Sequence, residues 1–238
     1  MTIKQDLGLH RCNLGKVYSN AIMSWSEFYE NVLDNTENNY KILDAGAGEG
    51  RLKELFHEYK IQYLGVDSAV GDTTWDYSNV VKADLEDLNF IKDNEFDLVI
   101  MIQVLEHLKN PAVVLRELNR VLKPGQRIFI SAPQGQGIHQ VPHDFFRFTP
   151  YGFNHLLEDA GFAMETINPQ LCGDLESSIN KTIWTLQYYI EENSKLTKFI
   201  LIMLYICMKI LNKFTRYFDN KSSRHTDPIG YFVTAKKK

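Results

Sequence analysis

The chain has 238 residues, 44% of them hydrophobic, and a formal net charge of −4 at pH 7. This length and apolar content suffice for the core of one large α/β domain with additions, so a single domain is the simplest expectation. The acidic balance excludes the overall basic signature of a nucleic-acid-binding protein, and we expect no nucleic-acid partner.

The spacing of the cysteines and the first residues of the chain indicate in which cellular compartment the protein is expected. Cys12, Cys172 and Cys207 are far apart and match neither a metal-ligand spacing nor a disulfide framework, which fits a reducing cytoplasm. The opening stretch "MTIKQDLGLHRCNLGK" lacks the apolar segment of a secretory signal. We therefore expect a cytoplasmic protein.

The first two thirds of the chain predict an α/β sheet. Apolar residues at helical spacing in 18–36 predict an amphipathic helix or helix pair. Strand-like and helix-like stretches then alternate from "YKILDAG" to "AMETINP", which predicts a parallel sheet covered by helices on both faces. Pro111 suits the first turn of one of these helices, and "KPGQ" is expected to end it.

The last third adds a segment that a compact sheet does not require. It reads as helical from about residue 175 to 218, and 199–208 is an unbroken apolar run of ten residues between Lys198 and Lys209. A membrane span needs about 20 residues, so we expect a buried or interfacial helix. The final stretch "IGYFVTAKKK" is a strand with no helix after it. We expect it to pair antiparallel beside the preceding strand.

Three glycines at alternate positions follow the strand-like run in "KILDAGAGEG", at Gly46, Gly48 and Gly50. Glycine inside a regular element costs backbone entropy and packs no side chain, so this cluster indicates a sharp turn that passes close to a ligand. Strand, glycine-rich turn and the helix-like "RLKELFHEYK" form the layout of a nucleotide site. The plainer alternative is a tight turn without a ligand.

These stretches resemble the motifs of class I S-adenosylmethionine-dependent methyltransferases, in the methyltransferase-11-like branch of small-molecule and glycan pathways. The resemblance covers about residues 40–170 and the last strand. It rests on five stretches in the family's order: "LDAGAGEG", "LGVD", "KADLEDL", "FDLVIMIQVLEHLKNP" and "LNRVLKPGQRIFISAP". It implies a Rossmann-like, seven-stranded, mostly parallel sheet with an antiparallel last strand, N-terminal helices and a C-terminal helical insertion.

The same resemblance implies which residues hold the methionine and ribose parts of S-adenosylmethionine. Asp44, Gly46, Gly48 and Gly50 belong to the turn beneath the methionine part. The carboxylate of Asp67, at the end of "LGVD", would accept hydrogen bonds from both ribose hydroxyls. The alternative for Asp67 is a helix cap.

Further cofactor contacts are implied around the adenine. The Asp84 side chain would meet the exocyclic amine and the Leu85 backbone the ring nitrogen, both within "KADLEDL". The resemblance also implies contacts at Ser68 and Gln103.

A dinucleotide-dependent oxidoreductase is the alternative of the same sheet class. The distance from Gly46 to Asp67 matches its fingerprint, which needs about 20 residues. That fingerprint, however, places its third glycine one residue later than this G-x-G-x-G turn does. Asp44 beside the turn would also repel a pyrophosphate and attract a methionine ammonium. The pattern therefore favours the methyltransferase.

The stretch "QGQGIHQVPHDFFRFTPYGF" supplies the candidate catalytic residues His139 and His143. It is expected at the carboxyl edge of the sheet, where ligands of open α/β folds bind. Because the cofactor carries the activated methyl group, a base is optional, and histidine suits that role near neutral pH. The alternative is that the histidines are solvated, while Asp144 pairs with Arg147 and the phenylalanines fill core.

"VLEHL" raises the question of a metal. Glu106 and His107 resemble the end of a divalent-ion motif of some quinone-pathway O-methyltransferases, but Gln103 stands where that motif has another carboxylate. Losing one carboxylate weakens a hard-cation site. We therefore expect no metal, and expect His107 to pack or cap behind the pocket.

The segment 195–224 is basic as well as apolar. It holds seven Lys or Arg and one Asp, a net charge of +6, which leaves −10 for the rest of the chain. A helix of this kind can cover a sheet face, lie on the inner face of a membrane as a peripheral contact, or form a homodimer interface. All three alternatives stay open at this point.

The sequence as a whole predicts one methyltransferase domain. Its parts are an N-terminal helical lid (1–39), a cofactor-binding core (40–170), a helical insertion (171–224) and a final strand (225–238). The expected reaction is methyl transfer to oxygen of a small molecule, a sugar or a lipid-linked glycan. The alternatives are an NAD(P)-dependent oxidoreductase and a catalytically inactive S-adenosylmethionine-binding regulatory subunit.

Overall fold

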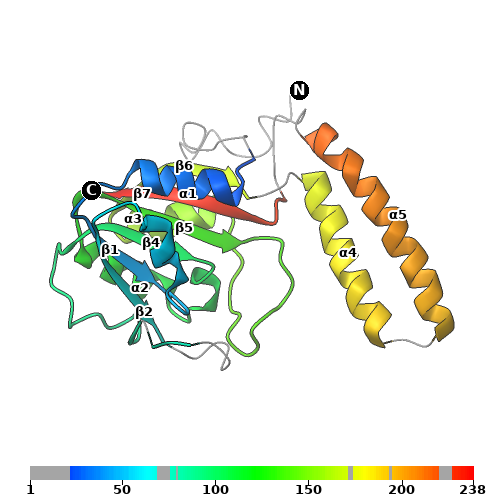
Figure 1. Cartoon of the computed structure of the whole chain (residues 1–238), viewed down its shortest axis with the longest axis horizontal. Helices are drawn as coiled ribbons and strands as arrows, with labels where there is room; N and C mark the ends of the chain where they lie inside the picture. Colours follow the sequence, from blue (N-terminus) through cyan, green and yellow to red (C-terminus); the bar gives the residue numbers. More distant parts are fainter. Residues whose placement is uncertain (1–21, 69–75, 79, 171–173, 193–194, 220–226) are drawn as a thin grey trace.

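The computed structural model describes residues 22–68, 76–78, 80–170, 174–192, 195–219 and 227–238. Its centre is a seven-stranded sheet in the order β3-β2-β1-β4-β5-β7-β6 (Figure 1). The strands are β1 (Lys41–Ala45), β2 (Gln62–Asp67), β3 (Val81–Lys82), β4 (Phe96–Ile102), β5 (Leu122–Pro133), β6 (Phe162–Pro169) and β7 (Gly230–Lys237). The predicted seven-stranded sheet is confirmed.

Strand directions also follow the prediction. Neighbouring strands from β3 to β5 pair in parallel, whereas β7 lies between β5 and β6 and pairs antiparallel to both. The expectation that the last strand pairs beside its predecessor is therefore confirmed. Because β1, β2 and β4 are parallel neighbours, their carboxyl ends meet at one edge of the sheet. Ligands of open α/β sheets bind at such an edge.

One face of the sheet is covered by helix α1 (Trp25–Asp34). A capping box begins this helix: the Ser24 side chain accepts from the Glu27 N–H, and the Glu27 carboxylate accepts from the Ser24 N–H. Phe28 and Val32 are buried against apolar side chains of β1, β4, β5 and β7. The predicted N-terminal amphipathic helix thus packs on the sheet.

The other face carries α2 (Pro111–Val121) and α3 (Pro150–Asp159), whose apolar sides join the larger core cluster. Pro111 stands in the first turn of α2, as predicted. The helix ends at Val121, just before "KPGQ", and the chain continues directly into β5.

The segment after the glycine turn differs from the expected helix. Residues Arg51–Phe56 form a short 3₁₀ helix, η3, closed by bonds such as Lys53 N–H to the Gly50 carbonyl. Gly50 at its N-cap has no side chain to cap the first turn. The chain must also enter β2 at Gln62, so few residues remain for a longer α-helix.

The predicted insertion is a hairpin of two helices, α4 (Asp174–Glu192) and α5 (Lys195–Asp219). They pack side by side and extend away from the sheet (Figure 1). The helix predicted for the apolar run 199–208 is confirmed as part of α5. Among the helices described, none combines the length and apolarity that a bilayer crossing demands. The predicted lid is described only from residue 22 onward, and the division at residues 39, 170 and 224 stays a prediction.

Candidate active site

The glycine turn after β1 brings bare backbone to the sheet edge. Gly46, Gly48 and Gly50 have φ of 79°, 54° and 74°, a region that residues with a side chain rarely adopt. A Cβ on Gly46 would lie 2.2 Å from Cγ2 of Val104. No larger residue fits there without a shift of the neighbouring chain.

The end of β2 is tied to this turn. The Gly48 N–H donates a 2.9 Å hydrogen bond to Oδ2 of Asp67. The Gly46 N–H donates to the Val66 carbonyl at 2.8 Å. Gly48 and Asp67, which are 19 residues apart, thereby hold the turn after β1 and the end of β2 together.

Asp44, the next-to-last residue of β1, is a buried carboxyl group, only 3% exposed. The Tyr63 hydroxyl on β2 donates a short hydrogen bond to its Oδ2. Burial raises the pKa of Asp44 to about 6, although the Tyr63 bond opposes the rise and the Asp67 charge adds to it. Burial also raises the pKa of Tyr63. Near neutral pH, Asp44 is therefore a negative charge that gains from a cationic ligand.

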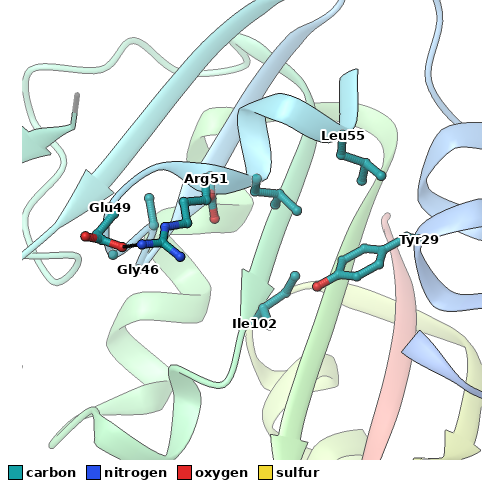
Figure 2. A pocket seen from close by; sticks show the side chains of 10 residues that line it. Tyr29, Gly46, Glu49, Arg51, Leu55 and Ile102 are labelled. Carbon is teal, nitrogen blue, oxygen red and sulfur yellow. Dashed lines mark ion pairs between the residues drawn. The ribbon is translucent and has the colours of Figure 1, made fainter. Parts of the chain in front are cut away.

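A cavity of about 790 Å³ opens beside this carboxylate. Figure 2 shows Tyr29 reaching from α1 toward Ile102 at the end of β4, with Leu55 of η3 above them. Glu49 and Arg51 form an ion pair of 2.6 Å at the mouth of the turn. The wall also includes Asp44, Gly46, Ala47, Gly48 and Leu52.

A second cavity of about 430 Å³ lies on the other side of the turn. Gly46 and Ile102 line both cavities, so the two share a wall. The second cavity brings together the remaining predicted cofactor residues: Asp67, Ser68, Asp84, Leu85 and Gln103. Eight of the nine predicted cofactor residues thus line one of these two cavities.

Gly50 is the exception. It lines neither of the two cavities but a neighbouring hollow with Arg51 and Glu54. Its positive φ serves the start of η3. The glycine therefore has a local backbone reason to be there, whether or not a ligand is bound.

The loop after β5 lines part of the second cavity and is held in place by internal hydrogen bonds. Arg147 donates two hydrogen bonds to Asp144, at 2.6 Å to Oδ1 and 2.8 Å to Oδ2, and further bonds to the carbonyls of Gln136 and Gly137. The Arg147 guanidinium holds the pKa of Asp144 near 2. The predicted Asp144–Arg147 pair is confirmed, and Phe148 is buried as expected. The expectation that the other phenylalanines fill core is wrong, because Phe145 and Phe146 are each 39% exposed.

The structure separates the two candidate catalytic histidines. His143 lines the second cavity, and its carbonyl accepts a 2.5 Å hydrogen bond from Nδ1 of His107. His139 lies behind that wall: its N–H donates to Asp144, and its Nε2 is 3.9 Å from Oε1 of Glu106. Of the two, His143 is the one placed to meet a ligand.

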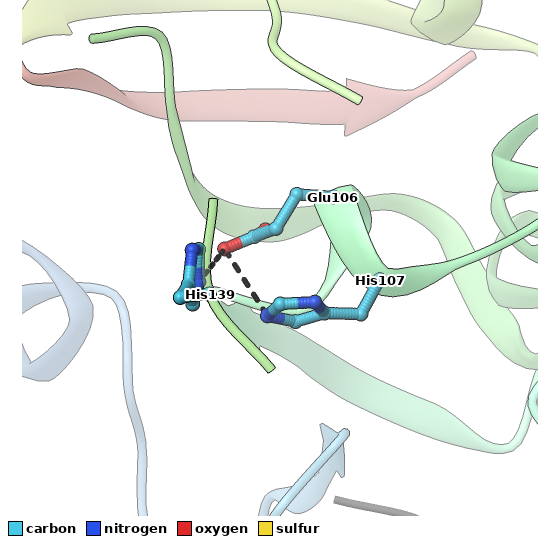
Figure 3. A group of neighbouring side chains, drawn as sticks. All are labelled: Glu106, His107 and His139. Atoms are coloured by element: carbon cyan, nitrogen blue, oxygen red, sulfur yellow. Dashed lines mark ion pairs between the residues drawn. The ribbon is translucent and has the colours of Figure 1, made fainter. Parts of the chain in front are cut away.

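Glu106 forms a buried cluster with His107 and His139 (Figure 3). Its side chain is 0% exposed, and neither carboxylate oxygen has a hydrogen-bond partner among the other described residues. Burial raises the pKa of Glu106 to about 7, and burial lowers the pKa of His107. The ligand atoms of the three residues lie within 4.8 Å of one another, a spacing able to hold a metal ion. The metal-free site stays a prediction.

Sequence reasoning missed some of this arrangement. It placed His107 behind the pocket, whereas His107 lines the second cavity. The stretch "VLEHL" was a signal for Glu106, but nothing in it pointed to His139 as a neighbour. Tyr29 and Tyr63 carried no signal, because their positions depend on how α1 and β2 pack.

Comparison with known proteins identifies the family. The family described as "Methyltransferase domain" matches residues 43–130. A probable S-adenosylmethionine-dependent methyltransferase of Mycolicibacterium smegmatis is 28% identical over 134 residues, which cover 52% of this chain and 52% of that protein. This region is a class I S-adenosylmethionine-dependent methyltransferase domain.

The methyltransferase domain also resembles a named enzyme. Ubiquinone biosynthesis O-methyltransferase of Stutzerimonas stutzeri is 27% identical over 153 residues, which cover 53% of this chain and 66% of that protein. The chain thus spans 52% and 66% of the length of these two relatives. The oxidoreductase alternative is set aside by these matches.

A solved structure shows the same fold. The crystal structure of a SAM dependent methyltransferase from Archaeoglobus fulgidus aligns with a TM-score of 0.56 at 19% identity, covering 87% of this chain and 90% of that one. This methyltransferase domain therefore has the predicted Rossmann-like fold, with S-adenosylmethionine as the cofactor of its family.

Proposed function

We propose that this chain transfers a methyl group from S-adenosylmethionine to an oxygen of a small molecule, a sugar or a lipid-linked glycan. One observation carries the proposal: the second cavity is lined both by acidic and amide groups and by His143. A donor and an acceptor can therefore be held in the same cavity. Enclosure matters because methyl transfer needs in-line alignment and exclusion of water.

The first cavity suits the methionine part of the cofactor. Gly46 lines this cavity with bare backbone, so the cofactor can approach the chain closely there. The buried Asp44 carboxylate offers a charge for the methionine ammonium, and Gly48 continues the same surface. When bound, the cofactor supplies a methyl group already activated on sulfur.

The second cavity suits the adenosine part. In this proposal Asp67 accepts the ribose hydroxyls while keeping its bond from Gly48, and Ser68 borders the sugar. Asp84 and the Leu85 backbone contact the adenine. Gln103, whose amide donates to Oγ of Ser131 at 3.2 Å, presents a fixed side chain between the two cavities.

His143 takes the proton of the acceptor hydroxyl in the proposed reaction. It lines the cavity wall, and the bond from His107 to its carbonyl holds its backbone in place. His139 contributes indirectly, because its N–H anchors Asp144 within the same loop. No metal ion is required, since the sulfonium carries the activation and the base removes the only proton.

Oxygen is the proposed acceptor atom for two reasons. One relative is named as an O-methyltransferase, and a histidine base at the cavity helps a hydroxyl more than an amine that is already nucleophilic. An acceptor of the small-molecule, sugar or glycan class needs space outside the adenosine region. Phe145 and His143, which also line this cavity, are the proposed neighbours of the acceptor.

Calorimetric titration with S-adenosylhomocysteine and, separately, with NAD tests the cofactor. Binding of S-adenosylhomocysteine without NAD supports the proposal, and binding of NAD alone overturns it. Transfer of labelled methyl groups to catechols, free sugars and polyprenyl-linked saccharides then tests the reaction. Cofactor binding without transfer to any hydroxyl acceptor would favour the alternative of an inactive regulatory subunit.

A further inference from the structure

The outer side of helix α5 is apolar and uncovered. Over residues 199–211 its outward side chains are almost all large and hydrophobic; Phe199 is 65% exposed and Ile200 56% exposed. Met203, Leu204 and Ile206 are each close to half exposed. Large contiguous apolar patches are rare on monomeric proteins and mark interaction sites. We call the exposed residues of 199–211 the outer face of α5.

This face is not the side by which α5 packs on α4. The less exposed positions of α5 are Lys198, Leu201, Tyr205, Met208 and Asn212, at spacings of three and four residues. Such spacing forms a single stripe along the helix. The stripe is the seam with α4, so the outer face covers most of the remaining circumference of the helix.

The partner helix has a mixed outward surface. Exposed positions of α4 include the polar Ser178, Thr182, Thr185 and Gln187, but also Leu175, Trp184 and Tyr189, which are 44%, 45% and 51% exposed. The apolar surface of the hairpin is therefore most continuous on its α5 side.

The outer face lies in a basic segment of the chain. The segment 195–224 carries a net charge of +6 against −10 for the rest of the chain. Lys209 and Lys213 are exposed, and Lys209 lies 5.5 Å from the centre of the Tyr205 ring. Basic residues beside an apolar helix face match an anionic surface with an apolar interior.

We propose that the outer face of α5 docks onto the surface of an anionic lipid bilayer. The apolar side chains of the outer face point away from α5 in several directions. A lipid bilayer can surround all of them, whereas a second copy of the chain would cover only one stripe along the helix. Two copies would also bring two segments of +6 together, which repel each other. The helix then lies in the interface, with its lysines among the headgroups. This inference does not rest on the proposed reaction.

Vesicle co-sedimentation of the full chain tests the proposal. One set of vesicles is phosphatidylcholine alone, and the other is an equimolar mixture of phosphatidylcholine and phosphatidylglycerol. We expect the chain to pellet with the mixture and to stay in solution with phosphatidylcholine. Binding should weaken as salt rises toward about 1 M, where the Debye length falls to about 3 Å.

Matched variants separate the face from general effects of charge. Phe199→Glu and Ile206→Glu place a carboxylate on the outer face and should each lower the bound fraction by about tenfold or more. Gln187→Glu adds the same charge on the exposed side of α4 and should bind as the unchanged chain does. Lys213→Gln should weaken binding by about fivefold. Thermal unfolding confirms that each variant is folded.

The outcomes are decisive in both directions. The proposal is overturned if the chain binds neither kind of vesicle. It is also overturned if the Phe199→Glu and Ile206→Glu variants pellet as the unchanged chain does. One further result would overturn the proposal. If the chain does not bind vesicles, elutes from gel filtration as a dimer, and becomes a monomer in the Ile206→Glu variant, the outer face is an interface between copies. These readouts use neither cofactor nor acceptor, so they fail or succeed separately from the methyltransferase proposal.

Discussion

The Gly48 N–H and the Asp67 carboxylate are joined by a 2.9 Å hydrogen bond that crosses from the glycine turn to the end of β2. The bond uses Oδ2 and fixes the orientation of the carboxylate at the wall of the second cavity. Asp67 therefore has a structural role that exists without a ligand, in addition to its proposed role toward ribose. Substitutions at this position can separate the two.

Asp67→Ala should weaken binding of S-adenosylhomocysteine by about 10- to 100-fold, because hydrogen bonds to a charged acceptor contribute about 1.5 to 3 kcal/mol. Asp67→Asn keeps an acceptor for the Gly48 N–H and should lose less. Calorimetry measures both. Asp159→Ala, which removes an exposed partner of Arg116, is the control. Unchanged affinity in Asp67→Ala would leave Asp67 as a structural acid only.

Gly46→Ala should both destabilise the fold and abolish measurable cofactor binding. The new Cβ meets Val104 at 2.2 Å, and φ of 79° disfavours any side chain. Together these effects should lower the free energy of unfolding by about 2 kcal/mol or more. Denaturant unfolding and calorimetry report the two losses.

Two further variants sharpen that prediction. Gly137→Ala is the matched control, since a Cβ there would have nothing within 4 Å. Adding Val104→Ala to Gly46→Ala should restore part of the stability, because it removes the collision and leaves the backbone strain. A Gly46→Ala chain as stable as the unchanged protein would contradict the described turn.

His143→Ala should lower turnover with a true acceptor by about 100-fold or more if this histidine is the base. His139→Ala should have the smaller effect, because His139 lies behind the cavity and acts through the loop. Initial-rate measurements at saturating cofactor compare the two, with the exposed His155→Ala as control. Unchanged turnover in His143→Ala would leave alignment and desolvation as the whole mechanism.

Stability should depend on pH through Glu106. Its folded pKa is raised to about 7 by burial, from a model-peptide value of 4.5. The folded state thus holds a proton that the unfolded state releases, so this contribution is full below about pH 4.5 and is lost as pH rises through 7. The loss is about 3 kcal/mol by this difference in pKa. Urea unfolding at about pH 5 and at about pH 8 measures this loss.

Glu106→Gln isolates that contribution from other groups. Asp44 also has a raised pKa and would add a dependence of the same sign at lower pH, but it is present in both proteins. The Glu106→Gln variant should therefore be more stable than the unchanged chain at high pH. This difference in the free energy of unfolding should shrink as pH falls. A pH-independent difference would show that Glu106 is ionised throughout.

Local patterns in the sequence were enough for most of the fold. Alternating strand-like and helix-like stretches predicted the sheet, Pro111 marked the start of α2, and the last strand was assigned its antiparallel place. These features depend on neighbours a few residues apart, so a linear pattern records them. The glycine turn was found for the same reason, because it follows directly from a strand, whereas Asp67 was implied by the resemblance to the methyltransferase family.

Tertiary structure alone decided which distant residues meet. Glu106 and His139 come from different loops, and their proximity depends on β4 and β5 being neighbours whose ends reach the same edge. The separation of His139 from His143 depends on the loop held by Arg147. The sequence determined that 199–211 forms an apolar helix, but only packing against α4 showed which side of it stays uncovered. The burial of a side chain depends on which distant segments of the chain pack against it. The periodicity of the sequence does not specify those segments.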